Sequence, residues 1–308
     1  MPADDELRVL KIRERVSHLL AGRAPGMAEG ESDLEQLVEQ VYSDVHACQG
    51  SSHGSMSSNR AELAEFTARA YAELGEIKFW YPGWRFISET EGRVTVCCPD
   101  GVEVAVRRVE TAVERRPDGE MSLRMSALAV PAESRWLHWT PPDRFTGTPD
   151  ARIYLNAVPD EAMEVWFELV RALEATGVRY VSKVGGSTEM LRRADCIVVY
   201  VNTSDAGHVI SGIRRLRLEK RLLEKVPGFS TPVATGVGVA IVAHTADTDV
   251  VPSVGYQWSR ALIEGWNRDR ERGLESVYAR LANSWGDARR AIGSGVSAEG
   301  SYAPPRRV

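Results

Sequence analysis

The stretch that decides the fold starts with residues 151–157, which read Ala-Arg-Ile-Tyr-Leu-Asn-Ala. Polar and apolar side chains alternate along it, and successive side chains of a β-strand point to opposite faces of the sheet. We therefore expect Arg152, Tyr154 and Asn156 on one face of a strand, with the apolar residues between them facing a core. The pattern predicts a strand that presents three polar side chains together.

A helix and two more strands are predicted after this stretch. Apolar residues recur at helical spacing from about Pro159, and Gly177 is expected to end that helix. Residues 178–184, Val-Arg-Tyr-Val-Ser-Lys-Val, read as a second strand. Its alternation places Arg179, Val181 and Lys183 on the same face. Residues 196–201, Cys-Ile-Val-Val-Tyr-Val, read as a third strand, whose continuous apolar run predicts burial on both faces.

The spacing of apolar residues divides the rest of the chain into regions. Apolar residues recur at helical spacing in the N-terminal part, and short apolar runs separated by turns follow. Asp205 is expected to cap a basic helix that reaches about Lys225. The expected fold class is α+β, with a helical N-terminal region (1–76), a small antiparallel β layer (77–150), a C-terminal mixed α/β half (151–292) and a disordered tail (293–308).

Composition excludes several classes of protein. The chain has 308 residues, and 38 basic against 43 acidic side chains give a net charge of −5, which argues against a nucleic-acid partner. Its four cysteines form no CxxC pair, so we expect neither a disulfide framework nor a zinc site. The beginning of the sequence is charged and does not resemble a signal peptide, and no apolar run is long enough to span a membrane. A cytoplasmic protein without membrane contact is expected.

Several familiar catalytic motifs are absent from the sequence. It contains no GxSxG, HExxH, Walker A or kinase signature. Residues 235–239, Thr-Gly-Val-Gly-Val, lack the third glycine of a dinucleotide fingerprint and are interpreted as a turn. The six histidines have no metal-ligand spacing. The basic run 214–221 reads as a solvated helix face, and the alternative is a grip on an acidic leader peptide or a partner subunit.

Five segments carry a resemblance to a known family. Together they resemble the HopA-type effector family, some of whose members look like the lyase subunits of class V lanthipeptide and thioamitide biosynthesis. The similarity extends over about residues 78–270, and the family is distantly similar to phosphothreonine lyases of the OspF and SpvC type. The segments are RIYLN from Arg152, VSKV from Val181, RRADCIVVYV from Arg192, PGFSTPVATGVGVA from Pro227 and GYQWSRALIEGW from Gly255.

The resemblance implies a role for each of six residues. Lys183 matches the lysine that acts as the base, and Tyr154 occupies the place of the general-acid histidine. The remaining four would surround the phosphate. The sequence departs from the family pattern at Tyr154, where a phenol replaces an imidazole, and at residues 255–257, which read Gly-Tyr-Gln instead of Ser-Phe-Gly. The implied phosphate-binding residues are Arg152, Arg193, Tyr200 and Arg260.

The chemistry of these side chains fits such a site. Guanidinium groups stay charged and make paired hydrogen bonds to phosphate. Elimination needs a base at the Cα proton, and neighbouring arginines favour the neutral amine of a lysine, whereas bound phosphate opposes it. A buried tyrosine can protonate the leaving oxygen or simply bind the phosphate. No metal or other cofactor is required, because the arginines stabilise the negative charge on the leaving phosphate.

The expected reaction is a carbon–oxygen lysis. The resemblance implies removal of phosphate from phosphoserine or phosphothreonine in a ribosomal precursor peptide, which leaves dehydroalanine or dehydrobutyrine. Because the chain has no kinase motif, a separate Ser/Thr kinase is expected to supply the phosphate, in a complex with this protein. One alternative is a non-catalytic subunit that binds the phosphopeptide or leader and scaffolds the kinase, and another is an effector-like protein that acts on host proteins. Any one of these residues alone is more often structural, but their order and strand placement favour a site.

Overall fold

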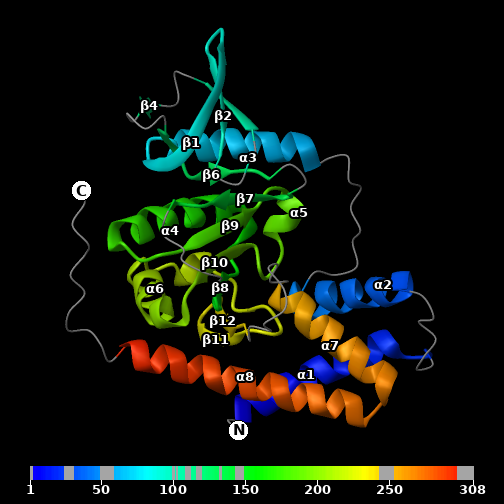
Figure 1. Ribbon diagram of the computed structural model, residues 1–308. Helices are drawn as coiled ribbons and strands as arrows, with labels where there is room; N and C mark the ends of the chain where they lie inside the picture. Colours follow the sequence, from blue (N-terminus) through cyan, green and yellow to red (C-terminus); the bar gives the residue numbers. More distant parts are fainter. Residues whose placement is uncertain are drawn as a thin grey trace.

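A seven-stranded antiparallel sheet forms the centre of the protein (Figure 1). The computed structural model describes residues 3–23, 31–48, 59–98, 101, 103–107, 112–115, 120–131, 134–142, 149–242 and 253–296. The strands lie in the order β11-β12-β8-β10-β9-β7-β6, and each pair is antiparallel. They are β6 (Leu128–Ala129), β7 (Trp136–Trp139), β8 (Ala151–Leu155), β9 (Val181–Gly185), β10 (Ile197–Val201), β11 (Thr231–Ala234) and β12 (Val237–Ile241).

The three predicted strands lie side by side at the middle of this sheet. β10 is buried along its length except at Tyr200, which confirms the burial expected from its apolar run. β8 and β9 flank it, and β9 begins at Val181, later than predicted. One face of the sheet packs on α4 (Ala162–Thr176) and α6 (Thr203–Arg215), where the Trp166 indole donates a hydrogen bond to Ser182 at 3.0 Å. The other face carries the polar side chains of β8.

One predicted helix is confirmed and the other is wrong in its extent. A 3-10 turn (Pro159–Glu161) leads into α4, and Gly177 ends it with φ 72°, the left-handed conformation that glycine adopts without strain. α6 is capped at Asn202 rather than Asp205 and ends at Arg215, not near Lys225. The left-handed φ of 52° at Arg217 stops the helix, and a short 3-10 turn (Glu219–Arg221) follows it.

The first two N-terminal helices and the π-helical turn after them pack against the two C-terminal helices in a second core, which contains Trp266 and Trp285. The third N-terminal helix packs on the main core instead. The last helix of the chain lies below the main sheet in Figure 1. α8 extends to Val296, so the disordered tail predicted for residues 293–308 is wrong for residues 293–296, and residues 297–308 lie outside the described part. The elements are α1 (Ala3–Leu20), α2 (Glu31–Val41), a π-helical turn (Tyr42–His46), α3 (Asn59–Leu74), α5 (Thr188–Leu191), α7 (Val254–Arg268) and α8 (Arg272–Val296).

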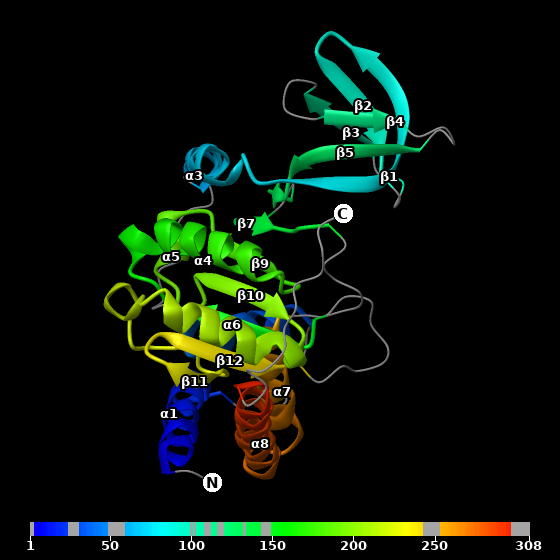
Figure 2. The ribbon, with the colours of Figure 1, turned by 90° about the vertical axis from the view of Figure 1, so that its left-hand side faces the viewer.

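A smaller sheet stands clear of the rest of the molecule (Figure 2). Its five antiparallel strands enclose a separate small core around Trp84 and Leu123. The predicted turn at residues 99–101 lies mostly outside the described part, but Gly101 has the φ of 85° that suits such a turn. The order is β3-β2-β1-β5-β4, with β1 (Lys78–Thr90), β2 (Arg93–Cys97), β3 (Glu103–Arg107), β4 (Ala112–Arg115) and β5 (Met121–Ser126).

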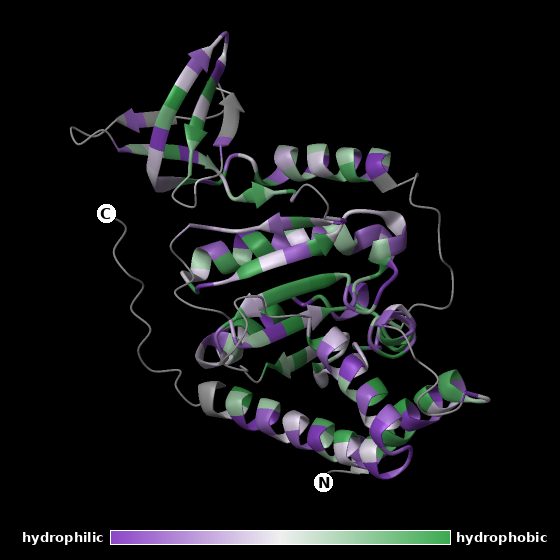
Figure 3. Cartoon of the chain, turned by 45° about the vertical axis from the view of Figure 1, so that its right-hand side comes forward, coloured by the Kyte–Doolittle hydropathy of each residue, from purple (hydrophilic) through white to green (hydrophobic). Residues whose placement is uncertain are grey.

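The structure confirms the α+β fold class. Hydrophobic residues concentrate on the strands of the main sheet, whereas the outer helices alternate between apolar and polar residues (Figure 3). β6 and β7 come from the segment expected to form the β layer, yet β7 pairs with β9 and β6 pairs with β7, so both extend the main sheet. Among the described residues, no helix combines the length and the apolar character that a membrane crossing requires.

Candidate functional site

Polar side chains occupy two neighbouring rows on the face of the main sheet that is opposite α4 and α6. In one row, Lys183 on β9 and Tyr154 on β8 lie on either side of Val198 on β10. In the next row, Arg152 lies directly beside Tyr200. Side chains opposite each other on adjacent strands are within contact distance. The sheet register therefore brings four of the six predicted residues onto one small surface.

Aromatic rings surround the Lys183 amine. Its Nζ lies 4.1 Å from the centre of the Trp136 ring on β7 and 5.7 Å from that of Tyr200. The Arg152 guanidinium lies 5.4 Å from the same Tyr200 ring. Cations are attracted to the faces of aromatic rings at such distances. No carboxylate of the described residues forms an ion pair with Lys183, so its amine is held mainly by rings.

Tyr154 is almost completely buried beside these cations. Only 3% of its surface is exposed. Burial raises the pKa of its phenol well above the ordinary value, although the charge of Arg152 and a hydrogen bond with its side chain act in the opposite direction. Tyr154 is therefore protonated at neutral pH and has a proton to donate.

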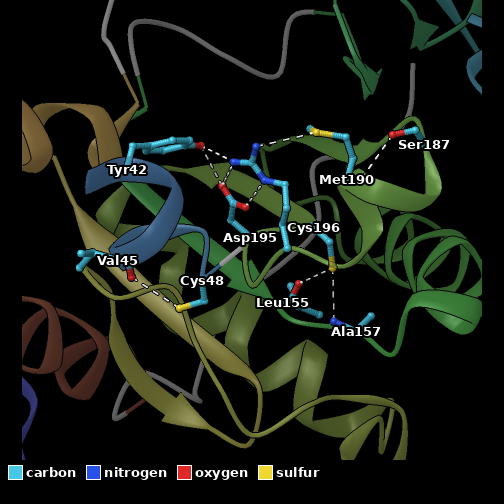
Figure 4. A network of polar contacts seen from close by, with 10 residues as sticks. Tyr42, Val45, Cys48, Leu155, Ala157, Ser187, Met190, Asp195 and Cys196 are labelled. Carbon is cyan, nitrogen blue, oxygen red and sulfur yellow. Dashed lines mark hydrogen bonds and ion pairs between the residues drawn. The ribbon is translucent and has the colours of Figure 1, made fainter. Parts of the chain in front are cut away.

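Arg193 is held in one orientation by a buried carboxylate (Figure 4). Its Nε and Nη2 donate to the two oxygens of Asp195 at 2.8 and 2.9 Å. Burial alone would raise the pKa of Asp195, but the Arg193 guanidinium holds it well below its usual range. Arg193 also lies over the Trp136 ring at 5.5 Å, so one indole contacts both Lys183 and Arg193.

A π-helical turn of the N-terminal region covers this face of the sheet. Its Tyr42 hydroxyl contacts both Arg193 and Asp195. Its His46 ring stacks on Phe229 at 5.5 Å and meets the Tyr154 ring edge-on at 5.4 Å. π-helical turns are rare and frequently occur at functional sites. The site is thus completed by residues that lie far from it in sequence.

Burial and nearby cations keep two histidines neutral. Burial, together with the charges of Arg193, Arg152 and Lys183, lowers the pKa of His46 to about 4 against the opposing effect of Asp195. His138, which faces Lys183 across β7 and β9, also has its pKa lowered to about 4, by burial and then by Lys183. At neutral pH neither histidine adds to the charge of the site.

His46 should make the stability of the fold depend on pH. Its folded pKa of about 4 lies below the ordinary 6.5, so the unfolded chain binds more protons between these values and stability falls as the pH drops through them. Urea unfolding of the wild type should show a loss of about 2 kcal/mol from this group between pH 7.5 and pH 5. His46→Leu should remove that part of the loss, whereas His18→Gln, at an exposed position, should retain it. An unchanged pH dependence in His46→Leu would contradict this assignment.

Arg260 lies apart from the other predicted residues. It projects from α7 and pairs with Glu35 of α2 and, at 3.6 Å, with Glu264. Its guanidinium also lies 5.8 Å from the Tyr256 ring, and 39% of its side chain is exposed. Among the described residues it makes no ion pair, hydrogen bond or ring contact with Lys183, Tyr154 or the other arginines. Its role as a phosphate ligand stays a prediction.

Four residues of this surface were not singled out from the sequence. Asp195 stands two positions after Arg193, so a carboxylate next to a candidate phosphate ligand was an available signal. Trp136 belongs to a segment expected in the other sheet. Tyr42 and His46 come from a helical segment with no recognisable motif, and nothing in their local pattern indicates this contact.

No metal site was found in the part of the chain that the structure describes. Within it, no three side chains among histidine, cysteine, aspartate and glutamate are grouped to hold an ion. All four cysteines are free thiols, and Cys196 is buried, with its pKa raised mainly by burial.

The chain is similar to solved structures of effector proteins and, over part of its length, to one protein family. Two solved structures are similar in fold: the effector protein from Pseudomonas syringae pv. syringae strain 61, with 11% identity and a TM-score of 0.48, and that from Pseudomonas syringae pv. tomato strain DC3000, with 15% identity and a TM-score of 0.49. They cover 91% and 90% of this chain, respectively, and 94% of their own. No curated protein matches by sequence. Residues 141–282, which hold all six predicted site residues, match the HopA1 effector protein family, so this chain carries a HopA1 effector family domain.

Proposed function

We propose that this protein is a phosphoserine and phosphothreonine lyase that acts on a ribosomally made precursor peptide. It would eliminate phosphate to leave dehydroalanine or dehydrobutyrine, as in lanthipeptide or thioamitide biosynthesis. The observation that carries this proposal is the shared sheet face on which Lys183, Arg152, Tyr154 and Tyr200 meet, with Arg193 beside them. A lysine that forms no ion pair with a carboxylate of the described residues, next to two arginines and a protonated phenol, supplies the groups that an elimination needs.

The phosphate would be held by arginines rather than by a metal. Arg152 is buried, with only 4% of its surface exposed, and buried guanidinium groups bind phosphate strongly because water competes little. Arg193 adds directed hydrogen-bond donors, although Asp195 compensates its charge. Tyr200 is half-buried between Arg152 and Lys183 and can donate its hydroxyl to a phosphate oxygen.

The reaction would need one base and one acid. Lys183 Nζ takes the proton from Cα of the phosphorylated residue, and the electron pair of that bond forms the Cα–Cβ double bond. The Cβ–O bond breaks, and the phosphate leaves with its electron pair. Tyr154 then gives its proton to the leaving oxygen, while the arginines stabilise the charge that develops there. No covalent intermediate with the protein is required.

A separate Ser/Thr kinase would supply the phosphorylated substrate and form a complex with this protein. The sequence contains no ATP-binding or kinase motif, which supports the proposal that another protein adds the phosphate. A second candidate function, a non-catalytic phosphopeptide-binding subunit, is favoured by one observation. The side chains of Lys183 and Arg193 both contact the Trp136 ring. Two cations that bind phosphate without taking part in catalysis could be held in the same way.

Intact-mass analysis distinguishes the two candidates. A phosphorylated precursor peptide incubated with this protein should lose phosphoric acid, about 98 Da, if the protein is a lyase. Unmodified peptide should change only when the kinase and ATP are added, and the kinase should co-elute with this protein in size-exclusion chromatography. An unchanged phosphopeptide that still binds tightly would support the scaffold, and dehydration of unmodified peptide by this chain with ATP alone would contradict the division of labour.

Replacing Arg152 should weaken phosphopeptide binding selectively. Arg152→Ala removes a buried, charged hydrogen-bond donor, so we expect a loss of roughly 2–5 kcal/mol with the phosphopeptide and little change with the unphosphorylated peptide. Arg260→Ala should cost less, on the order of 1 kcal/mol, because its side chain is more exposed and already paired with Glu35. Isothermal titration with both peptides measures the difference. Equal losses for both peptides would show that Arg152 is a structural residue.

A further inference from the structure

The hydroxyl of Tyr42 joins the N-terminal helical region to a candidate phosphate ligand. It donates a hydrogen bond to Asp195 Oδ2 at 3.0 Å and accepts one from Arg193 Nη2 at 2.5 Å (Figure 4). Asp195 accepts from Arg193 Nε and Nη2 at 2.8 and 2.9 Å. Two of the three guanidinium nitrogens are therefore committed to these two side chains.

The third nitrogen of Arg193 is differently placed. Nη1 lies 3.8 Å from the Met190 sulfur, which is a weak acceptor. Among the residues that the structure describes, no oxygen accepts a hydrogen bond from Nη1. Because a guanidinium is planar and rigid, fixing Nε and Nη2 also fixes the direction in which Nη1 points. An anion that binds here would find this nitrogen already oriented.

We propose that Tyr42 and Asp195 are positioning residues that hold Arg193 so that Nη1 is presented to the substrate phosphate. This inference rests on the proposed function, since it takes the anion to be a phosphorylated side chain. Asp195 also cancels the positive charge of Arg193. The charge excess of the site therefore comes from Arg152 and Lys183, and Arg193 contributes a directed donor.

The turn that carries Tyr42 is itself fixed on several sides. The Ala47 carbonyl accepts a hydrogen bond at 2.9 Å from the amide of Ala194, next to Arg193, and the His46 carbonyl accepts one at 3.2 Å from Gly228. A Cβ atom at Gly255 of α7 would lie 2.3 Å from the His46 ring and 2.6 Å from the Tyr42 ring, so the close packing of α7 requires glycine there. Tyr42 is thus held against Arg193 by both backbone and ring contacts.

Tyr42→Phe tests this inference with a change of one oxygen atom. The full chain is mixed with a synthetic phosphothreonine peptide, and single-turnover reactions at increasing protein concentration separate the dissociation constant from the rate of elimination. We expect the dissociation constant to rise on the order of tenfold, as expected for the loss of a hydrogen bond to a charged group, with little change for the unphosphorylated peptide. Tyr278→Phe is the matched control, because its buried hydroxyl has no hydrogen-bond partner among the described residues and lies in the core shared by α1, α7 and α8.

A double-mutant cycle shows whether Tyr42 acts through Arg193. Arg193→Lys retains a cation for Asp195 but removes the guanidinium nitrogen Nη1. Tyr42→Phe should then have little further effect on phosphopeptide affinity, because coupled residues are not additive. If Tyr42→Phe lowers phosphopeptide affinity tenfold both in the wild type and in Arg193→Lys, or does not lower it in the wild type, the inference is wrong. The proposed function would still stand in either case if the wild-type protein removes phosphate from the peptide. A wild-type protein that neither binds nor changes the phosphopeptide would overturn the proposed function itself.

Discussion

Replacing Lys183 with alanine is expected to abolish the loss of phosphoric acid while phosphopeptide binding is largely retained. The proposed task of Lys183 is to take one proton from Cα, and general bases contribute roughly 10²–10⁴-fold to a rate. Arg152 and Arg193 remain in the variant, so affinity should fall far less than the rate does. Single-turnover mass spectrometry at saturating protein measures the rate without interference from binding.

Two further variants make the Lys183 experiment decisive. Lys183→Arg keeps the positive charge but should also fail, since a guanidinium stays protonated and cannot act as a base. Lys220→Ala removes a lysine at an exposed position and should behave as the wild type does. If Lys183→Ala loses phosphoric acid at a nearly normal rate, the proposed mechanism is wrong, and a rate retained in Lys183→Arg would show that the residue acts only through its charge.

Tyr154→Phe is expected to lower the rate of elimination by roughly two to four orders of magnitude while phosphopeptide affinity is nearly unchanged. The variant keeps the buried ring that packs against His46 and removes only the proton donor. Because burial raises the pKa of this phenol, the wild-type group is protonated throughout the neutral range, so the defect should not disappear between pH 6 and 8, a range of about two units around neutrality.

Tyr180→Phe is the matched control for Tyr154. Tyr180 is also fully buried and donates a hydrogen bond to Glu174 at 2.9 Å, but it lies in the main core, away from the polar face. Its variant should lose stability and keep the rate. If instead Tyr154→Phe loses affinity and keeps its rate, Tyr154 is a phosphate ligand, and Tyr200 or water protonates the leaving oxygen.

The sequence alone determines which side chains share a face of the main sheet. Alternation along residues 151–157 places Arg152 and Tyr154 on the same face of β8. The same two-residue period places Lys183 on the face of β9 that points away from the core. The continuous apolar run of β10 predicted burial on both faces, because a strand that is covered on both faces excludes polar residues almost entirely. The end of α4 at Gly177 was predictable for a similarly local reason, the left-handed backbone that glycine permits.

Only the tertiary structure decides what completes the site. Tyr42 is 151 residues from Arg193 in the chain, and their hydrogen bond depends on how α2, α7 and the main sheet pack, which no local pattern encodes. Strand pairing likewise brings β7, and with it Trp136, to Lys183, and the ion pairs of Arg260 with Glu35 and Glu264 depend on how α7 lies against α2. Periodicity fixes which way a side chain points, whereas contacts between distant segments are set by the packing of the whole chain.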